Sequence, residues 1–508
     1  MGDSGVGHVV VVGAGLAGLS AAAHLLGSGR RVTVLERRPD PGGRVADDER
    51  AGHTVETGAS VLTMPELLDE TFAAVGDTTA AWLDLVRLDP AYRAHFVDGS
   101  TVALHTDAEA MEAEIESVAG PGEAAGYRRL RRWLTALYEV QRDRFIGSDF
   151  DSPLELARPE LMRLAVLGGF GRLGPAIGRF LRDDRLRRLF SFQSLYAGLD
   201  PARALAAYAV IAYMDTVAGV YHPRGGMGAL ARALAGALGR AGGEVRTGTR
   251  VARLERASSQ VSAVVTAEGE RLACDAVVLA TDLTTAYALL RARPRRPVPL
   301  RYSPSAVVLH GSTHRDWPAL DHHTLFFGGA WRRTFAEIAR EGRLMSDPSL
   351  LVTRPTATDP GLAPPGRQVL SVLAPAPNLH TGRLDWPGLA PAYRDELLRT
   401  LAGRGLDGFA DDVEIDEVVT PRTWAERGLA AGTPFSLSHT LVQTGPFRPA
   451  NRVRGIDNAV LAGCGTVPGV GIPPVLISGR LAAARLTGAH RARRRSRASA
   501  PSSVRSTS

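Results

Sequence analysis

Near the start of the chain lies a glycine motif whose spacing suits the binding of a pyrophosphate. Gly13 can make a tight turn after an apolar strand, Gly15 lets the backbone approach the phosphates, and Gly18 lets the following helix pack closely on that strand. The N-terminus of this helix would point its N–H groups and its positive dipole at the phosphates. Glu36, at the end of the next predicted strand, can accept hydrogen bonds from the hydroxyls of a ribose. The residues predicted to contact a dinucleotide here are Gly13, Ala14, Gly15, Ala17, Gly18 and Glu36.

The residues that follow Glu36 indicate which dinucleotide is bound. They read Arg-Arg-Pro-Asp-Pro-Gly-Gly-Arg, from Arg37 to Arg44. A Pro-Gly-Gly sequence alone would indicate an ordinary turn. Directly after the acid, it resembles the pattern of the flavin amine oxidase and carotenoid desaturase superfamily, in which this second glycine pair lies against FAD. The resemblance implies that Arg37, Gly43 and Arg44 are further cofactor contacts.

A second motif, rich in glycine and proline, runs from Gly463 to Pro474. It follows a short apolar stretch that predicts a buried strand, and its glycines permit a backbone that lies close to a flat ligand. Pro473 or Pro474 suits the first turn of a helix. The N-terminus of that helix would stabilise the negative charge of a reduced flavin by about 0.3–2 kcal/mol. The contacts predicted in this motif are Gly463, Gly465, Thr466, Gly471 and Ile472.

The second motif is similar to one in the bacterial-type phytoene desaturases, which is close to Gly-Ala-Gly-Thr-His-Pro-Gly-Ala-Gly-Ile-Pro-Gly-Val. The similarity covers nearly the whole chain, up to about residue 488. It includes the segments that begin at Phe190, Tyr221, His322, Thr358, Val372 and Phe447. The chain departs from the family pattern at Val467, at Pro474 and over residues 57–60. These departures leave open the number of desaturation steps and the exact carotenoid.

The resemblance implies an FAD-dependent oxidoreductase that dehydrogenates phytoene stepwise toward lycopene in carotenoid biosynthesis. It also implies that Gly58 and Ala59 lie by the cofactor and that Val251 packs near the adenine. Such a reaction passes a hydride from an allylic carbon to the flavin and a proton from the neighbouring carbon to a base. Orientation of the substrate in a dry apolar tunnel is then the main task of the protein. Oxygen or a quinone is the expected electron acceptor.

Few side chains in the sequence suit the role of that base. The family often has an Asp and an Arg three residues apart early in the substrate domain, and the matching pair here is Glu155 and Arg158. This spacing places both side chains on one helix face, where they either take part in catalysis or form a surface ion pair. Asp215, after an apolar run, is a further candidate. His322 and His323 are either structural or catalytic.

The residue types that the chain lacks argue against several other classes of protein. The sequence of 508 residues contains no lysine, which excludes Schiff-base chemistry and a Walker-type phosphate site and disfavours an amine oxidase. Cys274 and Cys464 are the only cysteines, so no disulfide framework or cysteine-rich metal site is possible, and no metal is expected. The open alternatives are another carotenoid-modifying flavoenzyme (a related desaturase, an oxygenase or a ketolase), an amine oxidase, or a non-catalytic protein that binds FAD or lipid.

Basic charge is concentrated in the last residues of the chain. The formal net charge is +7, but residues 490–508 hold six arginines and no acid, so the rest of the chain carries about +1. The low apolar content of 489–508 predicts a disordered arginine-rich tail, which is either a solvated extension or attracted to anionic lipid. Nucleic acid is not an expected partner, because this charge does not lie on a folded face.

The substrate implied by the resemblance is a lipophilic carotenoid dissolved in lipid. The protein is therefore expected to be cytoplasmic and peripherally associated with the membrane surface. The stretch from Leu161 to Leu181, in which arginines lie among apolar residues, is the candidate contact. Residues 4–29 lack charged side chains, but their glycine spacing argues against a transmembrane helix.

Two patterns alternate along the chain and predict a discontinuous α/β fold. Strand and helix patterns typical of a nucleotide-binding fold occupy residues 1–105, 216–294 and 446–488. Between them, 106–215 is mainly helical, and 295–445 is a second segment outside this fold. We therefore expect a Rossmann-like FAD-binding domain made from the first three segments. An α+β substrate-binding domain, made from the other two, would be inserted into it.

Overall fold

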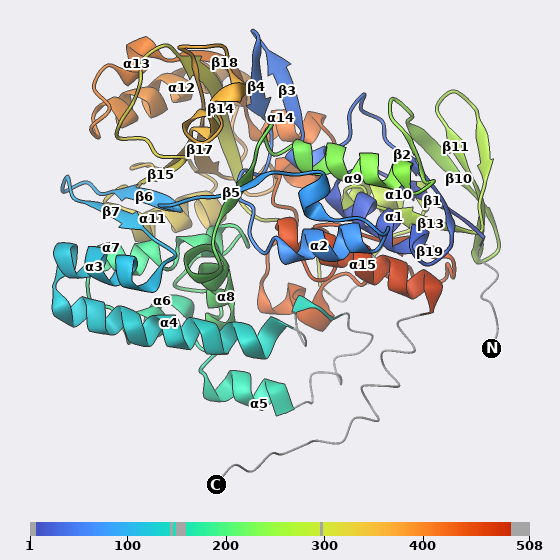
Figure 1. Cartoon of the computed structure of the whole chain (residues 1–508), viewed down its shortest axis with the longest axis horizontal. Coiled ribbons are helices and arrows are strands. Elements are labelled where there is room, and N and C mark those ends of the chain that lie inside the picture. The colour runs from blue at the N-terminus through green and yellow to red at the C-terminus, as the bar shows by residue number, and fades with distance from the viewer. Residues whose placement is uncertain (1–6, 143–145, 149–158, 295–297, 489–508) are drawn as a thin grey trace.

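The computed structural model describes residues 7–142, 146–148, 159–294 and 298–488. Its described residues form two large β-sheets, of five and seven strands, with helices packed around them (Figure 1). The mixed α/β architecture agrees with the fold class that the sequence predicts.

The five-stranded sheet is parallel throughout and has the strand order β19-β13-β1-β2-β9. Its strands are β1 (His8–Val12), β2 (Arg31–Leu35), β9 (Glu244–Arg246), β13 (Ala276–Leu279) and β19 (Ala459–Leu461). Alternate residues of β1 face opposite layers: Val9 and Val11 pack among helices, whereas Val10 and Val12 pack toward a second, antiparallel sheet. Burial on both faces explains why β1 is continuously apolar.

Helices from both ends of the chain pack together beside this sheet. They are α1 (Leu16–Leu26), α2 (Glu66–Ala73), α9 (Ala229–Arg240) and α15 (Ile472–Thr487). Helices α1 and α15 approach closely, because a Cβ atom at Gly479 would overlap the carbonyl oxygen of Ala17. The hydroxyl of Ser20 donates a hydrogen bond to the carbonyl of Leu476 at 2.8 Å. Since β1 and β19 run in the same direction, the two glycine motifs that follow them lie at the same edge of the sheet.

An antiparallel sheet of three strands packs on the other face of the parallel sheet. It consists of β10 (Val251–Ala257), β11 (Gln260–Thr266) and β12 (Arg271–Ala273), in that order. Buried side chains of β10 and β11 share a hydrophobic cluster with Val10 and Val12 of β1. This small sheet places Val251 beside the nucleotide-binding end of the parallel strands.

The seven-stranded sheet has the order β18-β14-β17-β16-β15-β6-β7 and is antiparallel except between β15 and β6. Its strands are β6 (Tyr92–His95), β7 (Thr101–Leu104), β14 (Ser305–Thr313), β15 (His323–Phe326), β16 (Leu350–Thr353), β17 (Gln368–Ala376) and β18 (Glu414–Val419). Val307 and Leu309 of β14 pack with α12 (Trp386–Ala402) on the outer face. Val308 and His310 point the other way, into a cavity.

Strands β6 and β7, which lie within residues 1–105, belong to the seven-stranded sheet. Residues 1–105 were expected to begin the FAD-binding domain, but β6 pairs with β15 of the seven-stranded sheet. Strand β5 (Leu85–Arg87) pairs with β8 (Tyr221–Pro223) just before this crossing. The boundary expected at 105 therefore does not coincide with the change of sheet, because alternating burial identifies a strand but not its partner.

A group of helices packs against the β6–β7 edge of this sheet. They are α3 (Ala108–Ala119), α4 (Pro121–Gln141), α5 (Pro159–Val166), α6 (Leu173–Ile177), α7 (Asp184–Leu189) and α8 (Ala209–Tyr213). In Figure 1 they occupy the lower left, with α5 below α4. The stretch from Leu161 to Phe192 lies in the part of the chain expected to be mainly helical, and its α-helical residues fall in three short helices.

One hairpin and four short helices complete the described elements of this size. They are the hairpin β3 (Asp47–Arg50) and β4 (His53–Glu56) and the helices α10 (Leu283–Leu289), α11 (Trp331–Ala336), α13 (Phe409–Asp412) and α14 (Pro421–Glu426). Within the described part of the chain, no helix has the length and apolar character needed to cross a membrane.

Candidate functional site

A cavity of about 1340 Å³ lies between the parallel sheet and the seven-stranded sheet. Its wall combines the glycine motifs that follow the parallel strands with side chains from the inner face of the second sheet. The predicted cofactor contacts that line it are Gly13, Gly15, Ala17, Glu36, Arg37, Gly43, Arg44, Gly58, Ala59, Val251, Gly463, Gly465, Gly471 and Ile472. Segments that are far apart in the sequence therefore meet around one space.

Three predicted contacts stand behind the cavity wall instead of lining it. The N–H of Ala14 donates to the carboxylate of Glu36 at 2.8 Å. A Cβ atom at Gly18 would overlap the carbonyl oxygen of Gly13, so Gly18 serves the packing of α1 on β1. The hydroxyl of Thr466 donates to a carbonyl of its own motif at 3.0 Å. These residues shape the wall from behind.

The two N-terminal glycine motifs lie against each other. Gly13 has φ +107°, and a Cβ atom there would lie 2.8 Å from the carbonyl oxygen of Ala280, so the turn requires glycine. The N–H of Gly42 donates to the carbonyl of Ala14 at 3.0 Å, and Gly42 bridges to Gly15. The second glycine pair thus lies beside the first motif at the cavity wall.

Arg44 joins the second glycine pair to the segment around residue 58. Its guanidinium forms an ion pair with Asp282 at 3.1 Å. Its carbonyl accepts the N–H of Ala59 at 2.9 Å, and a Cβ atom at Gly58 would overlap the same carbonyl oxygen. Gly58 is therefore required by a close approach of two backbone segments, which the sequence alone does not reveal.

Glu36 is buried at the end of β2, with 7% of its surface exposed. Its two carboxylate oxygens accept the N–H groups of Ala14 at 2.8 Å and of Arg38 at 2.9 Å. Each carboxylate oxygen has two lone pairs, so further hydrogen bonds from ribose hydroxyls remain possible. The backbone around β1 and β2 thus fixes the acid in the position that the motif predicts.

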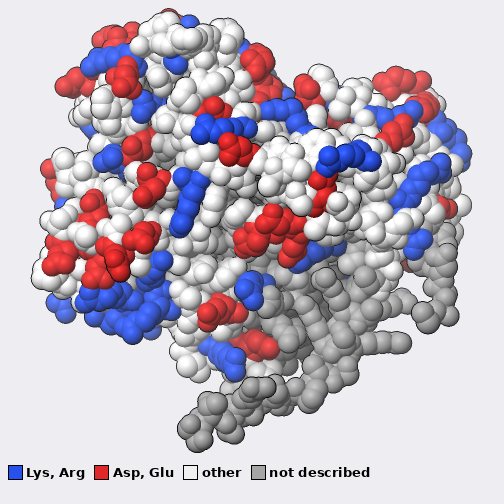
Figure 2. Space-filling view, in the orientation of Figure 1, with Lys and Arg blue, Asp and Glu red and all other residues white. Residues whose placement is uncertain are grey.

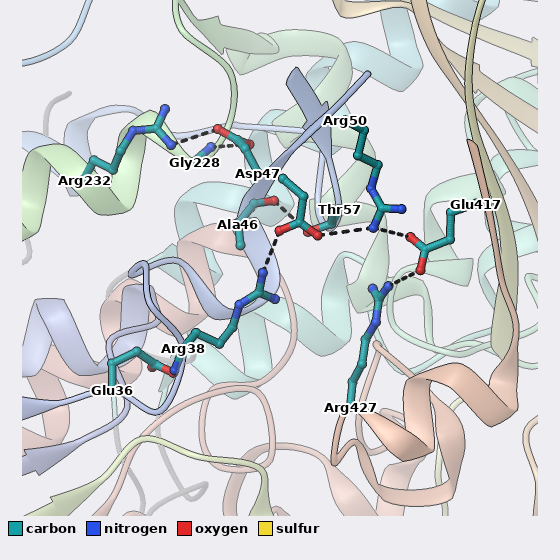
Figure 3. A network of polar contacts seen from close by, with 11 residues as sticks. Glu36, Arg38, Ala46, Asp47, Arg50, Thr57, Gly228, Arg232, Glu417 and Arg427 are labelled. Carbon is teal, nitrogen blue, oxygen red and sulfur yellow. Dashed lines mark hydrogen bonds and ion pairs between the residues drawn. The ribbon is translucent and has the colours of Figure 1, made fainter. Parts of the chain in front are cut away.

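A chain of ion pairs links this nucleotide end to the second sheet (Figure 3). Asp48 pairs with Arg38 at 2.7 Å and with Arg50 at 3.4 Å. Glu417 of β18 pairs with Arg50 at 2.9 Å and with Arg427 at 2.7 Å. The network fixes the β3–β4 hairpin between the two sheets and so fixes the width of the cavity at this end.

His439, which lines the cavity, and Arg448, which does not, both contact the second glycine motif. Gly469 has φ +146°, and a Cβ atom there would overlap the ring of His439. Burial, and secondarily the charge of Arg448, lowers the pKa of His439 well below its usual range. The neutral ring accepts the N–H of Val470 at 3.3 Å. Arg448 donates to the carbonyl of Thr466 at 2.9 Å. Sequence reasoning did not select either residue, because their partners lie on other segments.

The rest of the cavity is mainly apolar. Side chains from α5, α8, the seven-stranded sheet and the segment before β19 line it, among them Leu164, Phe170, Val210, Ile211, Met214, Leu351, Leu373, Phe435, Leu441 and Phe447. The same space therefore combines an end lined by the glycine motifs and Glu36 with a mainly apolar part.

Of the three predicted acid–base residues Glu155, Arg158 and Asp215, only Asp215 lies within the described residues. Glu155 and Arg158 lie outside the described residues. Asp215 lines the cavity and is 2% exposed. Burial raises its pKa to about 7, although a hydrogen bond from Tyr92 opposes the shift.

His322 and His323 do not line the cavity and have structural partners. Their Nδ1 atoms contact the hydroxyls of Thr358 at 2.8 Å and Thr353 at 3.2 Å. Burial lowers the pKa of His323 to about 3, so the ring is neutral at physiological pH. Both histidines are therefore part of the core between β15 and its neighbours. Among the described residues no group of three or more His, Cys, Asp or Glu side chains is placed to hold a metal ion.

A parallel sheet that ends in two facing glycine motifs, with an acid at the end of its second strand, is the architecture of a dinucleotide-binding oxidoreductase. The cavity continues from this end into an apolar chamber. The chain belongs to the family described as flavin containing amine oxidoreductase, which matches residues 16–487. It is accordingly an FAD-dependent oxidoreductase, and the glycine cradle and Glu36 fit that cofactor.

Relatives with assigned names cover almost the whole chain. A phytoene dehydrogenase of Streptomyces griseus is 62% identical over 490 residues, which are 96% of each chain. A zeta-carotene-forming phytoene desaturase of Myxococcus xanthus is 35% identical over 491 residues, which are 95% of this chain and 94% of the relative. In fold, the chain is similar to the crystal structure of an oxidoreductase from Methanosarcina mazei, with a TM-score of 0.61, 17% identity and coverage of 93% and 98% of the two chains.

Proposed function

We propose that this enzyme is a phytoene desaturase, which dehydrogenates phytoene stepwise toward lycopene in carotenoid biosynthesis. The observation that carries the proposal is the single cavity in which a dinucleotide site opens into a mainly apolar chamber. The phytoene dehydrogenase of Streptomyces griseus, identical at 62% of positions over nearly the full length, supports the choice of substrate.

The residues around the nucleotide end would hold FAD by distinct contacts. Glu36 would accept the ribose hydroxyls, and the N-terminus of α1 would face the pyrophosphate. Gly471 is the residue before α15, so the first turn of that helix would face the flavin. When bound, FAD supplies the acceptor for a hydride. The positive end of α15 would favour the negative charge that this transfer creates.

The apolar chamber would orient the substrate and exclude water. A linear hydrocarbon offers no hydrogen-bonding group, so shape and dispersion contacts with side chains such as Val210, Ile211 and Leu373 would decide which bond faces the flavin. Repeated dehydrogenation of one chain requires that it slide or rebind. Oxygen or a quinone would accept the electrons. The lack of lysine and the apolar lining disfavour an amine oxidase.

An apolar rim marks where a substrate dissolved in lipid would reach the chamber. Met162 and Val166 of α5 are 73% and 86% exposed. Leu441, which lines the cavity, is 58% exposed. Arginines gather over the neighbouring α4 in Figure 2, and Arg128, Arg129 and Arg132 of that helix are exposed. Apolar side chains beside basic charge suit an anionic membrane surface. We therefore propose that the enzyme is peripherally associated with the membrane at this rim.

Flotation with anionic liposomes tests the membrane proposal. A variant with Met162→Asp and Val166→Asp should partition onto the liposomes about tenfold less, since two apolar side chains no longer enter the lipid. Val97→Asp is the matched control, because Val97 is 59% exposed but follows β6 and is not part of α5. Equal binding of the double variant and the control would contradict the proposed rim. Deletion of 490–508 measures the part contributed by the arginine tail.

Glu155 and Arg158 remain proposed acid–base residues on the strength of the family resemblance. Glu155→Gln and Arg158→Ala should lower turnover strongly while FAD stays bound. Turnover close to that of the unmodified enzyme would make the two residues a structural ion pair.

Expression in a host that accumulates phytoene, followed by pigment chromatography, tests the function itself. The expected result is a coloured, conjugated product, most simply lycopene. A cell that contains the FAD-loaded enzyme and still shows only phytoene would overturn the proposal. A product with added oxygen would favour an oxygenase or ketolase, which the product mass distinguishes.

A further inference from the structure

We propose that Asp215 is a second acid–base residue, distinct from Glu155 and Arg158, and takes up the proton lost from phytoene when a hydride is transferred. The inference rests on the proposed desaturase function.

Asp215 lies in a π-helical turn, Met214–Ala218, directly after α8. Such turns interrupt the regular hydrogen bonds of a helix and occur frequently at functional sites. The side chain is 2% exposed and forms part of the cavity wall. A carboxyl group in the wall of a mainly apolar chamber is costly to bury, so its retention there needs a reason.

No cation compensates the carboxylate within the described part of the chain. The hydrogen bond from the hydroxyl of Tyr92, at 3.2 Å, is the contact found for it there. The hydroxyl of Tyr196 lies 3.4 Å from that of Tyr92, so two tyrosines and the acid form a short polar chain. By contrast Asp47, another buried acid, is paired with Arg232. The environment of Asp215 is that of a group free to gain and lose a proton.

Asp215 lies in the wall of the same cavity as the two flavin-type glycine motifs. Met214 and Val210, from the same part of the chain, also line this cavity. A substrate held in the cavity would therefore share one space with the flavin and with Asp215.

The step balances with the groups that the enzyme supplies. One C–H bond breaks with both electrons going to FAD as a hydride, and the C–H bond on the adjacent carbon breaks with its proton going to a carboxylate oxygen of Asp215. The electron pair left between the two carbons forms the new double bond. The substrate is oxidised by two electrons and FAD is reduced. Asp215 then loses its proton before the next cycle.

Of the groups packed around Asp215, Asp215 itself is the one expected to titrate near neutral pH; elsewhere in the cavity wall, burial raises the pKa of Glu56 to about 8. Burial raises the pKa of Tyr92 and that of Tyr196 above their usual value, so both stay protonated. Arg131 of α4 donates to the neighbouring carbonyl, that of Thr216, at 3.5 Å. His323 stacks on Tyr92, and burial lowers its pKa to about 3. On α8, burial raises the pKa of Tyr213.

The first test uses Asp215→Asn, which preserves shape but cannot accept a proton in this range. Turnover of phytoene dispersed in liposomes should fall at least about 100-fold, as expected on loss of a general base. Bound FAD, measured by absorbance, should stay within about twofold of the unmodified enzyme. Asp359→Asn is the control, because Asp359 is also a buried acid but is absent from the cavity wall. Near-normal turnover of Asp215→Asn would overturn the proposal.

The second test measures titration directly, with a pH profile that uses only the unmodified enzyme and Tyr92→Phe and with an infrared band that is compared with Asp215→Asn. The pKa of Asp215 is about 7, so turnover of the unmodified enzyme should rise with pH around neutrality as the carboxyl ionises. Tyr92→Phe removes a hydrogen bond that lowers this pKa, so the rise should move to higher pH. An infrared carboxyl band that titrates in the same range should vanish in Asp215→Asn. A profile that Tyr92→Phe leaves unmoved, or no such band, would overturn the proposal. If the unmodified enzyme forms no polyene, the proposed function fails instead.

Discussion

Replacement of Glu36 by alanine measures most sharply how much the nucleotide end of the cavity contributes to FAD binding. The carboxylate is buried at the cavity wall and accepts backbone N–H groups of Ala14 and Arg38 at 2.8 and 2.9 Å. In the complex it would also accept ribose hydroxyls. Hydrogen bonds to a charged group contribute about 1.5–3 kcal/mol. Loss of the ribose contact should therefore weaken FAD binding by about 10- to 150-fold.

The same substitution has a second, separable effect on the protein without FAD. The N–H groups of Ala14 and Arg38 lose their acceptor, which costs about 1–3 kcal/mol for a buried group. The thermal midpoint of the FAD-free protein therefore reports the structural part, and a titration with FAD, followed by flavin fluorescence, reports the binding part. Glu36→Gln should be intermediate, because its amide keeps one acceptor oxygen.

Glu244→Ala provides the matched control for this experiment. Glu244 lies on β9 of the same sheet, but its side chain is 55% exposed and does not line the cavity. We expect its FAD affinity to equal that of the unmodified protein. A Glu36→Ala variant that folds and binds FAD with unchanged affinity would refute the role assigned to Glu36.

Three further outcomes follow from the packing and the buried charges. Gly479→Val should destabilise the fold by at least about 2 kcal/mol, because its side chain would meet the backbone of α1, whereas Gly239→Ala, with open space around it, should be neutral or stabilising in the same thermal melts. Burial raises the pKa of Glu56 to about 8, whereas the unfolded chain loses this proton above the ordinary pKa of 4.5. The contribution of Glu56 to stability is therefore present at low pH and is lost as the pH rises toward 8. The gain in thermal midpoint from Glu56→Gln should grow from pH 5 to pH 8, and a constant gain over this range would be the contrary result. Arg448→Lys should weaken FAD binding about tenfold in fluorescence titrations. The guanidinium donates to the carbonyls of Leu437, Gln443 and Thr466, and one ammonium cannot reach all three. Unchanged binding would show that the second glycine motif keeps its shape without the guanidinium.

The sequence predicted the nucleotide end well because its signals are local. The turn at Gly13 and the helix that follows it depend on residues close together in the chain, and so does the acid at the end of β2. The second motif was equally readable, since Gly471 and the prolines after it mark the start of α15.

Features that depend on distant partners were not predictable from one sequence. The placement of β6 in the second sheet depends on its pairing with β15, more than two hundred residues later. His439 and Arg448 act on a loop that lies on another segment. Asp215 stood out in the sequence only as an acid after an apolar run, and its importance depends on Tyr92 and on the cavity. Local periodicity carries no information on such contacts.

Anaerobic reduction of the bound flavin by phytoene tests the central claim most directly. The unmodified, FAD-loaded enzyme is mixed with phytoene in anionic liposomes in the absence of oxygen and quinone, and the visible spectrum is followed. We predict that the absorbance of oxidised flavin is lost while a conjugated polyene band grows, in proportion to the FAD present. A flavin that stays oxidised in the presence of excess phytoene would contradict the account.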